Sequence, residues 1–425
     1  MAKSMISRKK INIHITVPSL LIVILIFFNL MLQEDAFSLK MRGMWIYITD
    51  ICILCVGCLT YVSKKKSIGS RELKEWGKIL FPFVVLTIYA IVLNSFINRM
   101  PYDEILTAGF YWIIPIVVAS VLYFSMKASV INIIYNTILV NYLMVIAKCV
   151  SINGLVYLFK ISTYTNNFGS LLEVHTIGLT LPLFLIYFLF EHFQNKKRLN
   201  WTFWIGALFT FMCGKRIVLI GILVVLVCYF ILRKKPNKLR KKELYLFMTI
   251  VFAMTFVYLL FVKYDGFLYV ARVLNINTMS RIETWGALKD LYSISPFFMG
   301  NGVGFSMYYL KNLNGIYIND FLNKVGDVHN DILKTYIDVG FWGFIFYMWY
   351  LFVKNLKFFL RKNCVETASL YFLLMIYTVF LMFVDNIMRY DLYLISLFLI
   401  PMVYKRCEEE KDEKLKNTKH YHTGI

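Results

Sequence analysis

The sequence predicts an all-α integral membrane protein with about twelve transmembrane helices. Of its 425 residues, 59% are hydrophobic and 17% are charged, whereas soluble domains are about 45–50% apolar and about 25% charged. A membrane-spanning helix needs about 20 apolar residues, and the chain contains enough of them for twelve such helices. This composition excludes a soluble globular enzyme, a disordered chain and a nucleic-acid-binding domain.

Twelve apolar runs follow one another along the chain, and each run predicts one span. The seventh and the twelfth runs are shorter than the others. The runs cover residues 15–33, 44–62, 79–97, 105–125, 129–150, 171–190, 200–213, 215–232, 243–262, 332–353, 365–384 and 391–404.

The basic residues predict the orientation of these spans. Alternate connections, beginning with the N-terminal segment, contain 31 of the 46 Lys and Arg residues. Cytoplasmic loops carry such an excess, so we expect both termini in the cytoplasm. The basic residues are scattered between apolar runs instead of forming one face, so the net charge of +21 does not indicate nucleic acid as a partner.

One connection, residues 263–330, is too long for an ordinary loop and is predicted to lie outside the cell. Its stretch 281–291 has apolar residues at helical spacing and predicts a short amphipathic helix. The glycine cluster 300–304 superficially suggests a phosphate-binding loop. Because no strand precedes it, we regard the dinucleotide-binding interpretation as very weak.

Three residues on the predicted outer side have the chemistry of an active site: Arg216, Arg281 and His329. Each alone has an ordinary explanation, since an arginine at a membrane boundary is often an anchor and a histidine often an interfacial polar group. Together they combine two anion-binding groups with a group that titrates near neutral pH. Gly340-x-x-Gly343, after His329, predicts the close approach of another span that would help to fix the histidine.

Other polar residues on this side are candidates for substrate binding. Glu173 and His175 begin the sixth span, where they would orient an acceptor or form a simple helix-start pair. Near the last outer turn, three charged residues predict an ion pair or a contact with an anionic substrate. These are Asp385, Arg389 and Asp391.

We expect no metal centre, because the outer loops lack an Asp-x-Asp pair. The acidic residues that remain as cation-binding alternatives are Asp320, Asp327 and Asp331.

Four motifs follow one another between residues 200 and 350. They are Gly214-Lys215-Arg216, Ser280-Arg281 with Trp285, Pro296 followed by Gly300-x-Gly302-x-Gly304, and His329-Asn330 followed after nine residues by Gly340-x-x-Gly343.

In order, spacing and topology these motifs resemble the O-antigen ligase and polymerase (Wzy-type) family of bacterial membrane glycosyltransferases. The resemblance implies a GT-C-like fold and a place in the bacterial cytoplasmic membrane. It also implies substrates linked to a polyprenyl diphosphate, with undecaprenyl diphosphate as the lipid carrier and no separate cofactor. Lys215 stands where the family often has serine.

The resemblance and the chemistry together assign His329 as the general base, and Arg216 and Arg281 as a clamp on the diphosphate. Lys215 and Asn330, their neighbours in the motifs, join Glu173, His175 and Arg389 as candidate substrate-binding residues. Direct displacement with a single base would invert the anomeric centre.

The first hypothesis for the function is a polymerase that joins lipid-linked oligosaccharide repeat units into a capsular, exopolysaccharide or O-antigen chain. A ligase that moves a finished glycan to another acceptor is the alternative within the same chemistry. A flippase for lipid-linked oligosaccharides is the alternative from another class, although it should show two similar halves and polar residues near the midplane. The lipid bilayer, a flippase and a chain-length regulator are the expected partners.

This interpretation divides the chain into four parts. Residues 1–199 form an N-terminal transmembrane bundle, and residues 200–353 form the core that resembles the family and includes the loop 263–330. Residues 354–404 form the C-terminal spans, and residues 405–425 form a solvated cytoplasmic tail.

Overall fold

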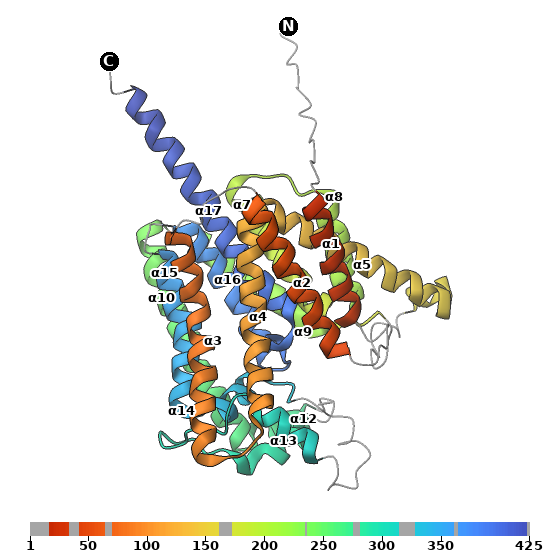
Figure 1. Ribbon diagram of the computed structural model, residues 1–425, viewed down its shortest axis with the longest axis vertical. Helices are drawn as coiled ribbons and strands as arrows, with labels where there is room; N and C mark the ends of the chain where they lie inside the picture. The colour runs from red at the N-terminus through yellow and green to blue at the C-terminus, as the bar shows by residue number, and fades with distance from the viewer. Residues whose placement is uncertain are drawn as a thin grey trace.

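The computed structural model describes residues 17–33, 42–63, 70–160, 172–233, 236–274, 281–313, 328–360 and 364–422. Across these ranges the chain is nearly all helical and contains no β-strand. The helices pack into one bundle (Figure 1), so the prediction of an all-α membrane protein is confirmed.

Nine helices in the described part of the chain are long and apolar enough to cross a membrane. One of them continues from α14 (Asp331–Trp349) through a π-helical turn (Tyr350–Lys354) into α15 (Asn355–Leu360). The other eight are α2 (Arg42–Ser63), α3 (Ser70–Ile97), α4 (Tyr102–Met126), α5 (Ser129–Asn153), α7 (His175–Asn195), α9 (Arg216–Arg233), α10 (Asn237–Lys263) and α16 (Val365–Met382).

The three remaining apolar runs are also helices, but they are short or only partly apolar. They form α1 (Val17–Gln33), α8 (Trp201–Met212) and the first half of α17 (Asp391–His422). At 1.5 Å per residue α8 is about 18 Å long, less than the hydrocarbon core of about 30 Å. In α17 the apolar residues are followed by a charged segment, and the predicted tail 405–425 continues as helix as far as His422.

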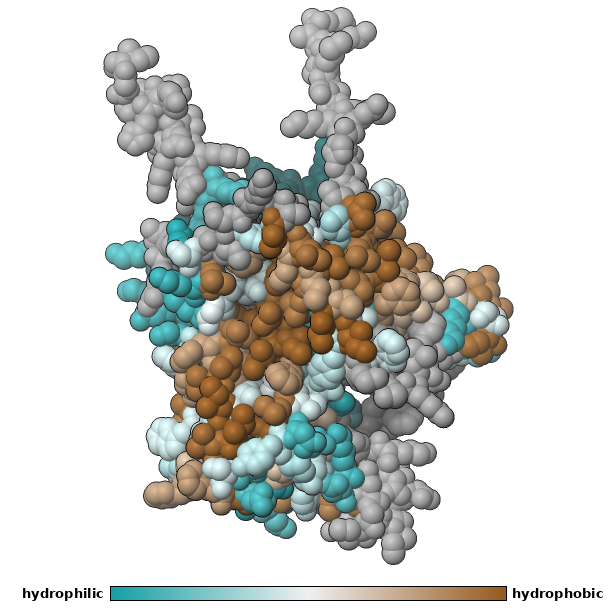
Figure 2. Space-filling model, viewed as in Figure 1, coloured by the Kyte–Doolittle hydropathy of each residue, from teal (hydrophilic) through white to brown (hydrophobic). Residues whose placement is uncertain are grey.

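The outer surface of the bundle is apolar. Figure 2 shows a broad hydrophobic band between more hydrophilic ends. Large apolar side chains such as Leu59, Ile88 and Phe96 are exposed on the surface of the protein. A water-soluble protein does not leave so large an apolar surface in contact with solvent. Burial is uneven, since 89% of the α16 span is buried against 22% of the α10 span, so α16 lies inside the bundle.

The segments between α10 and α14 gather at one end of the bundle. They include α11 (Gly266–Val273), α12 (Arg281–Leu288) with a 3₁₀ turn (Lys289–Leu291), and α13 (Phe305–Leu313). The start of α1 and the far end of α17 lie at the opposite end (Figure 1). The amphipathic helix predicted within 281–291 is therefore confirmed as α12 and its 3₁₀ turn, with Trp285 and Leu288 buried.

Ion pairs join the helices at the end that carries the far part of α17. Lys405 Nζ lies 2.6 Å from Glu75 Oε2 of α3, and both side chains are buried. Arg71 Nη2 of α3 lies 2.9 Å from Glu409 Oε1. These contacts hold the charged part of α17 against α3.

We expect the two ends of the bundle to lie on opposite sides of the membrane. In a variant whose eight free cysteines are replaced, Lys311→Cys in α13 should react with a membrane-impermeant maleimide added to intact spheroplasts. Glu410→Cys in α17 should react only after permeabilisation, because the positive-inside rule places this end in the cytoplasm. Both residues are exposed. Labelling of Glu410→Cys in intact spheroplasts would show that the predicted orientation is wrong.

Candidate active site

Asp385 is the centre of a charged cluster at the end of the bundle that carries α12. It lies in the turn between α16 and α17, with its side chain buried. Lys215 Nζ donates to its Oδ2 at 3.2 Å. His329 Nδ1 lies 3.7 Å from Oδ1, and His175 Nδ1 lies 4.0 Å from Oδ2. Four segments that are distant in the sequence therefore meet at one carboxylate.

The surroundings of Asp385 keep its carboxylate ionised. Burial by itself raises the pKa of Asp385, because it disfavours the charged form. The charge of Lys215, together with His329 and His175, outweighs burial and holds the pKa of this carboxyl well below its usual value. Asp385 is thus an anion at neutral pH and can accept a hydrogen bond from an N–H group beside it.

Lys215 enters the cluster from the turn between α8 and α9. Gly214, with φ +64°, reverses the chain after α8, so that the Lys215 side chain is buried. Its Nζ lies 2.6 Å from His175 Nδ1 and 3.9 Å from Glu173 Oε1. The next residue, Arg216, begins α9 and is exposed. The structure therefore places Lys215 inside the cluster and Arg216 on the surface beside it.

His329 is held by the residues on either side of it. Its backbone is left-handed, with φ +49°, a conformation that is uncommon for residues other than glycine and is often found at functional sites. Asn330 caps α14, because its side chain accepts from Leu333 N at 3.0 Å and donates to Tyr258 OH at 2.8 Å. The His329 side chain remains 38% exposed. Asn330 itself is completely buried, so its side chain holds the start of α14 and Tyr258 and does not reach the surface.

Helix α12 brings Arg281 to the same region. Trp285, one turn after Arg281 and on the same face, donates from its indole nitrogen to the Val328 carbonyl at 2.9 Å. The Nε atom of Arg281 is buried and has no hydrogen-bond partner among the described residues. A guanidinium nitrogen in this state favours an anionic ligand.

The pKa of Glu173 is influenced by the charge of Arg281, which links Arg281 to the cluster. Burial raises the pKa of Glu173, and the charge of Asp385 adds to this effect. Lys215 and Arg281 both oppose it, and the net result is a pKa above the usual value. Arg281 is therefore near enough to Glu173 for its charge to act there.

The glycine turn between residues 300 and 304 binds a carboxylate of the protein itself. Gly304 N and Ser306 N each donate to the Asp338 carboxylate at 2.9 Å, and Gly302 N donates to the Asp338 carbonyl at 2.8 Å. The turn thus donates its N–H groups to Asp338 of α14.

Gly340 does not allow the close approach of another span that the sequence predicted. It breaks the helical geometry of α14 with φ +71° and ψ −172°, and a Cβ there would lie 2.2 Å from Met299 C and 2.4 Å from Gly300 N. Its neighbour is therefore the glycine turn of the loop and not another span. Gly343 does face a span, because a Cβ at this position would lie 3.6 Å from Leu86 of α3.

The remaining candidates lie around this cluster. Arg389 ends a 3₁₀ turn (Ile387–Arg389) shortly after Asp385 and is exposed. Asp331 Oδ2 accepts from Met388 N at 2.8 Å, which ties the start of α14 to the same turn. Ser280 of the second motif, and the cation-binding alternatives Asp320 and Asp327, lie outside the described residues.

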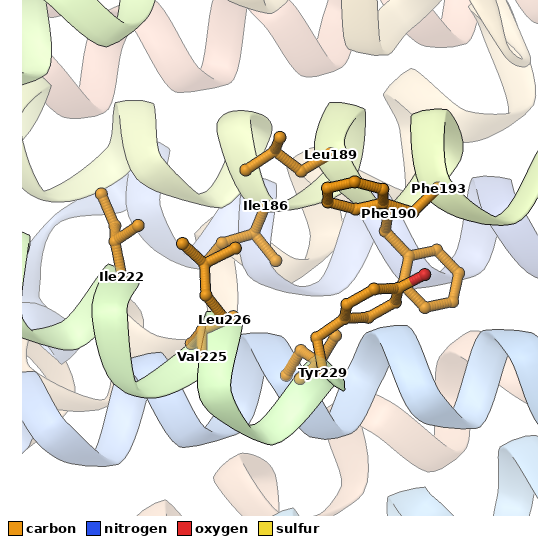
Figure 3. A pocket seen from close by; sticks show the side chains of 9 residues that line it. Ile186, Leu189, Phe190, Phe193, Ile222, Val225, Leu226 and Tyr229 are labelled. Carbon is orange, nitrogen blue, oxygen red and sulfur yellow. The ribbon is translucent and has the colours of Figure 1, made fainter. Parts of the chain in front are cut away.

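An apolar pocket lies at the other end of α7 from His175. It is lined by Ile186 and Phe190 of α7, Val225 and Tyr229 of α9, and Leu373 of α16 (Figure 3). No charged side chain lines it, so it is separate from the charged cluster.

The fold and the site define a multi-pass membrane protein whose acid–base and cationic groups meet at one end of a helix bundle. Residues 201–348 match the family described as O-Antigen ligase. This match confirms, for residues 201–348, the resemblance predicted from the four motifs, and it supports a membrane glycan polymerase or ligase in general. No curated protein compared with the chain gives a significant match.

The matched segment contains only part of the cluster. Lys215, Arg281 and His329 lie inside it, whereas Asp385, Glu173 and His175 lie outside. The sequence grouped Asp385 with Arg389 and did not connect it with Lys215 or His329. An acidic residue at the end of an apolar run was the available signal, because such a residue is costly unless it is paired.

We expect Gly340→Ala to destabilise the protein by about 2 kcal/mol or more, because the added methyl group would collide with the backbone of the glycine turn. Thermal unfolding in detergent measures the effect. Gly286→Ala in α12 is the matched control, because a Cβ there meets nothing within 4 Å and alanine favours helix. Equal melting temperatures for the two variants would contradict this account of the turn.

Proposed function

We propose that the chain is a polysaccharide polymerase at the outer face of the bacterial cytoplasmic membrane, with both termini in the cytoplasm. It joins oligosaccharide repeat units that are carried on a polyprenyl diphosphate. The observation that carries this proposal is the position of His329 beside the buried, ionised Asp385, with Lys215 in contact with that carboxylate. This arrangement suits a histidine that accepts a proton from a hydroxyl group of the acceptor.

In the proposed reaction a hydroxyl group of the acceptor sugar attacks the anomeric carbon of the donor. The new C–O bond forms as the bond from that carbon to the diphosphate oxygen breaks, and the lipid diphosphate leaves with the electron pair. The hydroxyl proton passes to Nε2 of His329. Asp385 then stabilises the imidazolium, as the carboxylate does in a Ser-His-Asp triad.

Cationic groups stabilise the leaving diphosphate. Arg281 is the strongest candidate, because its Nε is buried without a partner among the described residues and its planar fork fits phosphate oxygens. Arg216 adds a second guanidinium at the exposed start of α9, where the helix dipole also favours an anion. Lys215 already contacts Asp385 and His175, so we assign it to holding the acid–base pair.

A ligase is the second candidate, and the description of the matched family favours it. The two reactions share the base and the diphosphate clamp, and they differ in the acceptor and in the length of the glycan transferred. A flippase is less consistent with the structure, because a transporter places its polar groups near the midplane. Here His175 and Lys215 lie at the ends of α7 and α9.

Replacing His329 by alanine should remove polymer from the cells and leave single lipid-linked repeat units on the outer face. Loss of a general base lowers the rate by about 10²- to 10⁴-fold. Mass analysis of the extracted lipid-linked glycans measures the outcome. Normal chain lengths in this variant would refute the assignment of the base.

The same extract separates the alternatives. Loss of a ligase would leave finished polymer on the lipid, and loss of a flippase would leave single repeat units on the inner face.

Arg281→Lys should lower the rate of transfer by about 10-fold or more, because lysine keeps the charge but loses the bidentate geometry, and hydrogen bonds to charged groups contribute about 1.5–3 kcal/mol. The measurement is turnover of purified protein with extracted lipid-linked repeat units. Arg272→Lys is the matched control, since Arg272 is exposed on the neighbouring helix α11. Equal rates for the two variants would remove Arg281 from the clamp.

A further inference from the structure

Two histidines approach Asp385, one at each oxygen of its carboxylate. His329 faces Oδ1, and His175 faces Oδ2, which also accepts from Lys215. The His175 side chain is 41% exposed and that of His329 is 38% exposed, whereas those of Lys215 and Asp385 are 8% and 5% exposed. The side chains of Lys215 and Asp385 are thus enclosed. The imidazoles of His175 and His329, which lie beside them, reach the surface.

The buried ions select different tautomers of the two histidines. An ammonium group has three donors and no acceptor, so His175 Nδ1, at 2.6 Å from Lys215 Nζ, must be the acceptor and its proton lies on Nε2. The ionised carboxylate of Asp385 only accepts, so it favours the proton of His329 on Nδ1. His329 therefore offers a lone pair at Nε2, and His175 offers an N–H donor at Nε2.

The N–H donor of His175 lies beside an acceptor. Its Nε2 is 3.8 Å from Glu173 Oε1, and the Glu173 side chain is 24% exposed. Sugar hydroxyl groups both donate and accept hydrogen bonds, so adjacent hydroxyls fit a donor next to a carboxylate. A diphosphate has only acceptor oxygens and would be repelled by Glu173.

We propose that Glu173 and His175 form the subsite for the acceptor sugar, an inference that rests on the proposed transferase function. His175 Nε2 donates to an oxygen of the acceptor, and Glu173 accepts from one of its hydroxyl groups. Because both histidines approach the same carboxylate, a sugar held in this way has its attacking hydroxyl near His329 Nε2.

The position of the pair in the chain fits a role in specificity. Glu173 and His175 precede the segment 201–348 that matches the family, whereas His329 and Arg281 lie inside it. The segment common to the family thus supplies the proposed base and a cation of the clamp, and the acceptor subsite comes from a part of the chain outside the match.

Two substitutions at one position test the subsite. In His175→Asn the amide oxygen can still accept from Lys215, but the donor at the Nε2 position is lost. In His175→Gln the longer side chain returns an N–H group to that position. His192→Asn is the matched control, because His192 lies near the other end of α7 and binds the Lys197 carbonyl.

The assay uses two activities of the full-length protein in detergent. The donor is the lipid-linked repeat unit extracted from cells that lack this chain. The acceptor is the same oligosaccharide after mild acid has released it from the lipid diphosphate, so that it can accept but cannot donate. Slow hydrolysis of the donor, measured without acceptor, reports the donor side alone.

We expect His175→Asn to raise the KM for the acceptor by about 3- to 10-fold, the effect of one lost hydrogen bond, and to impair transfer more than donor hydrolysis. His175→Gln and His192→Asn should keep the KM for the acceptor near that of the wild type. An unchanged KM in His175→Asn, or an equal loss of hydrolysis and transfer, would overturn the subsite while leaving the proposed function intact. Wild-type protein that neither hydrolyses nor transfers the donor would overturn the proposed function and the subsite with it.

Discussion

The buried contact between Lys215 and Asp385 is the interaction on which the rest of the site depends. Neither charge is stable alone in a membrane protein interior, and removing one partner of a buried pair costs about 3–5 kcal/mol. The pair joins the turn before α9 to the turn between α16 and α17. The same turn then binds the start of α14 through Asn386 and Met388. The ion pair and the position of His329 are therefore parts of one assembly.

A second carboxylate organises the segment between α10 and α14. Asp338 accepts from the N–H groups of the glycine turn, and the close contact of Gly300 with Gly340 lets the loop backbone lie directly against α14. Trp285 fixes α12 to the residue before His329. Because the loop is tied to α14 at both places, Arg281 is delivered to the cluster by a folded element and not by a free loop.

The sequence predicted the helices well, because hydropathy and periodicity are local properties. In the part of the chain that the structure describes, each of the twelve apolar runs contains a helix, and α12 begins at the predicted residue. The partners of the polar residues were harder to predict. Asp385 and Lys215 are 170 residues apart, and no local pattern joins them. Lys215 and Arg216 are adjacent, so their side chains point in different directions, and the sequence could not show which one faces inward. Small residues at 340 and 343 indicated a close approach but not what approaches.

The match to the family covers residues 201–348, yet this segment alone cannot form the cluster. It contributes Lys215 and His329, but the carboxylate between them belongs to the turn after α16. Without that carboxylate Lys215 would lose its nearer anion and keep only Glu173, 3.9 Å away, and His329 would lose the group that favours its tautomer. The C-terminal helices therefore supply the carboxylate that joins the cluster, and the N-terminal part adds His175 at the second oxygen of Asp385. The cluster is assembled from segments on both sides of the matched region, so the proposed chemistry and the proposed acceptor subsite can come from different segments.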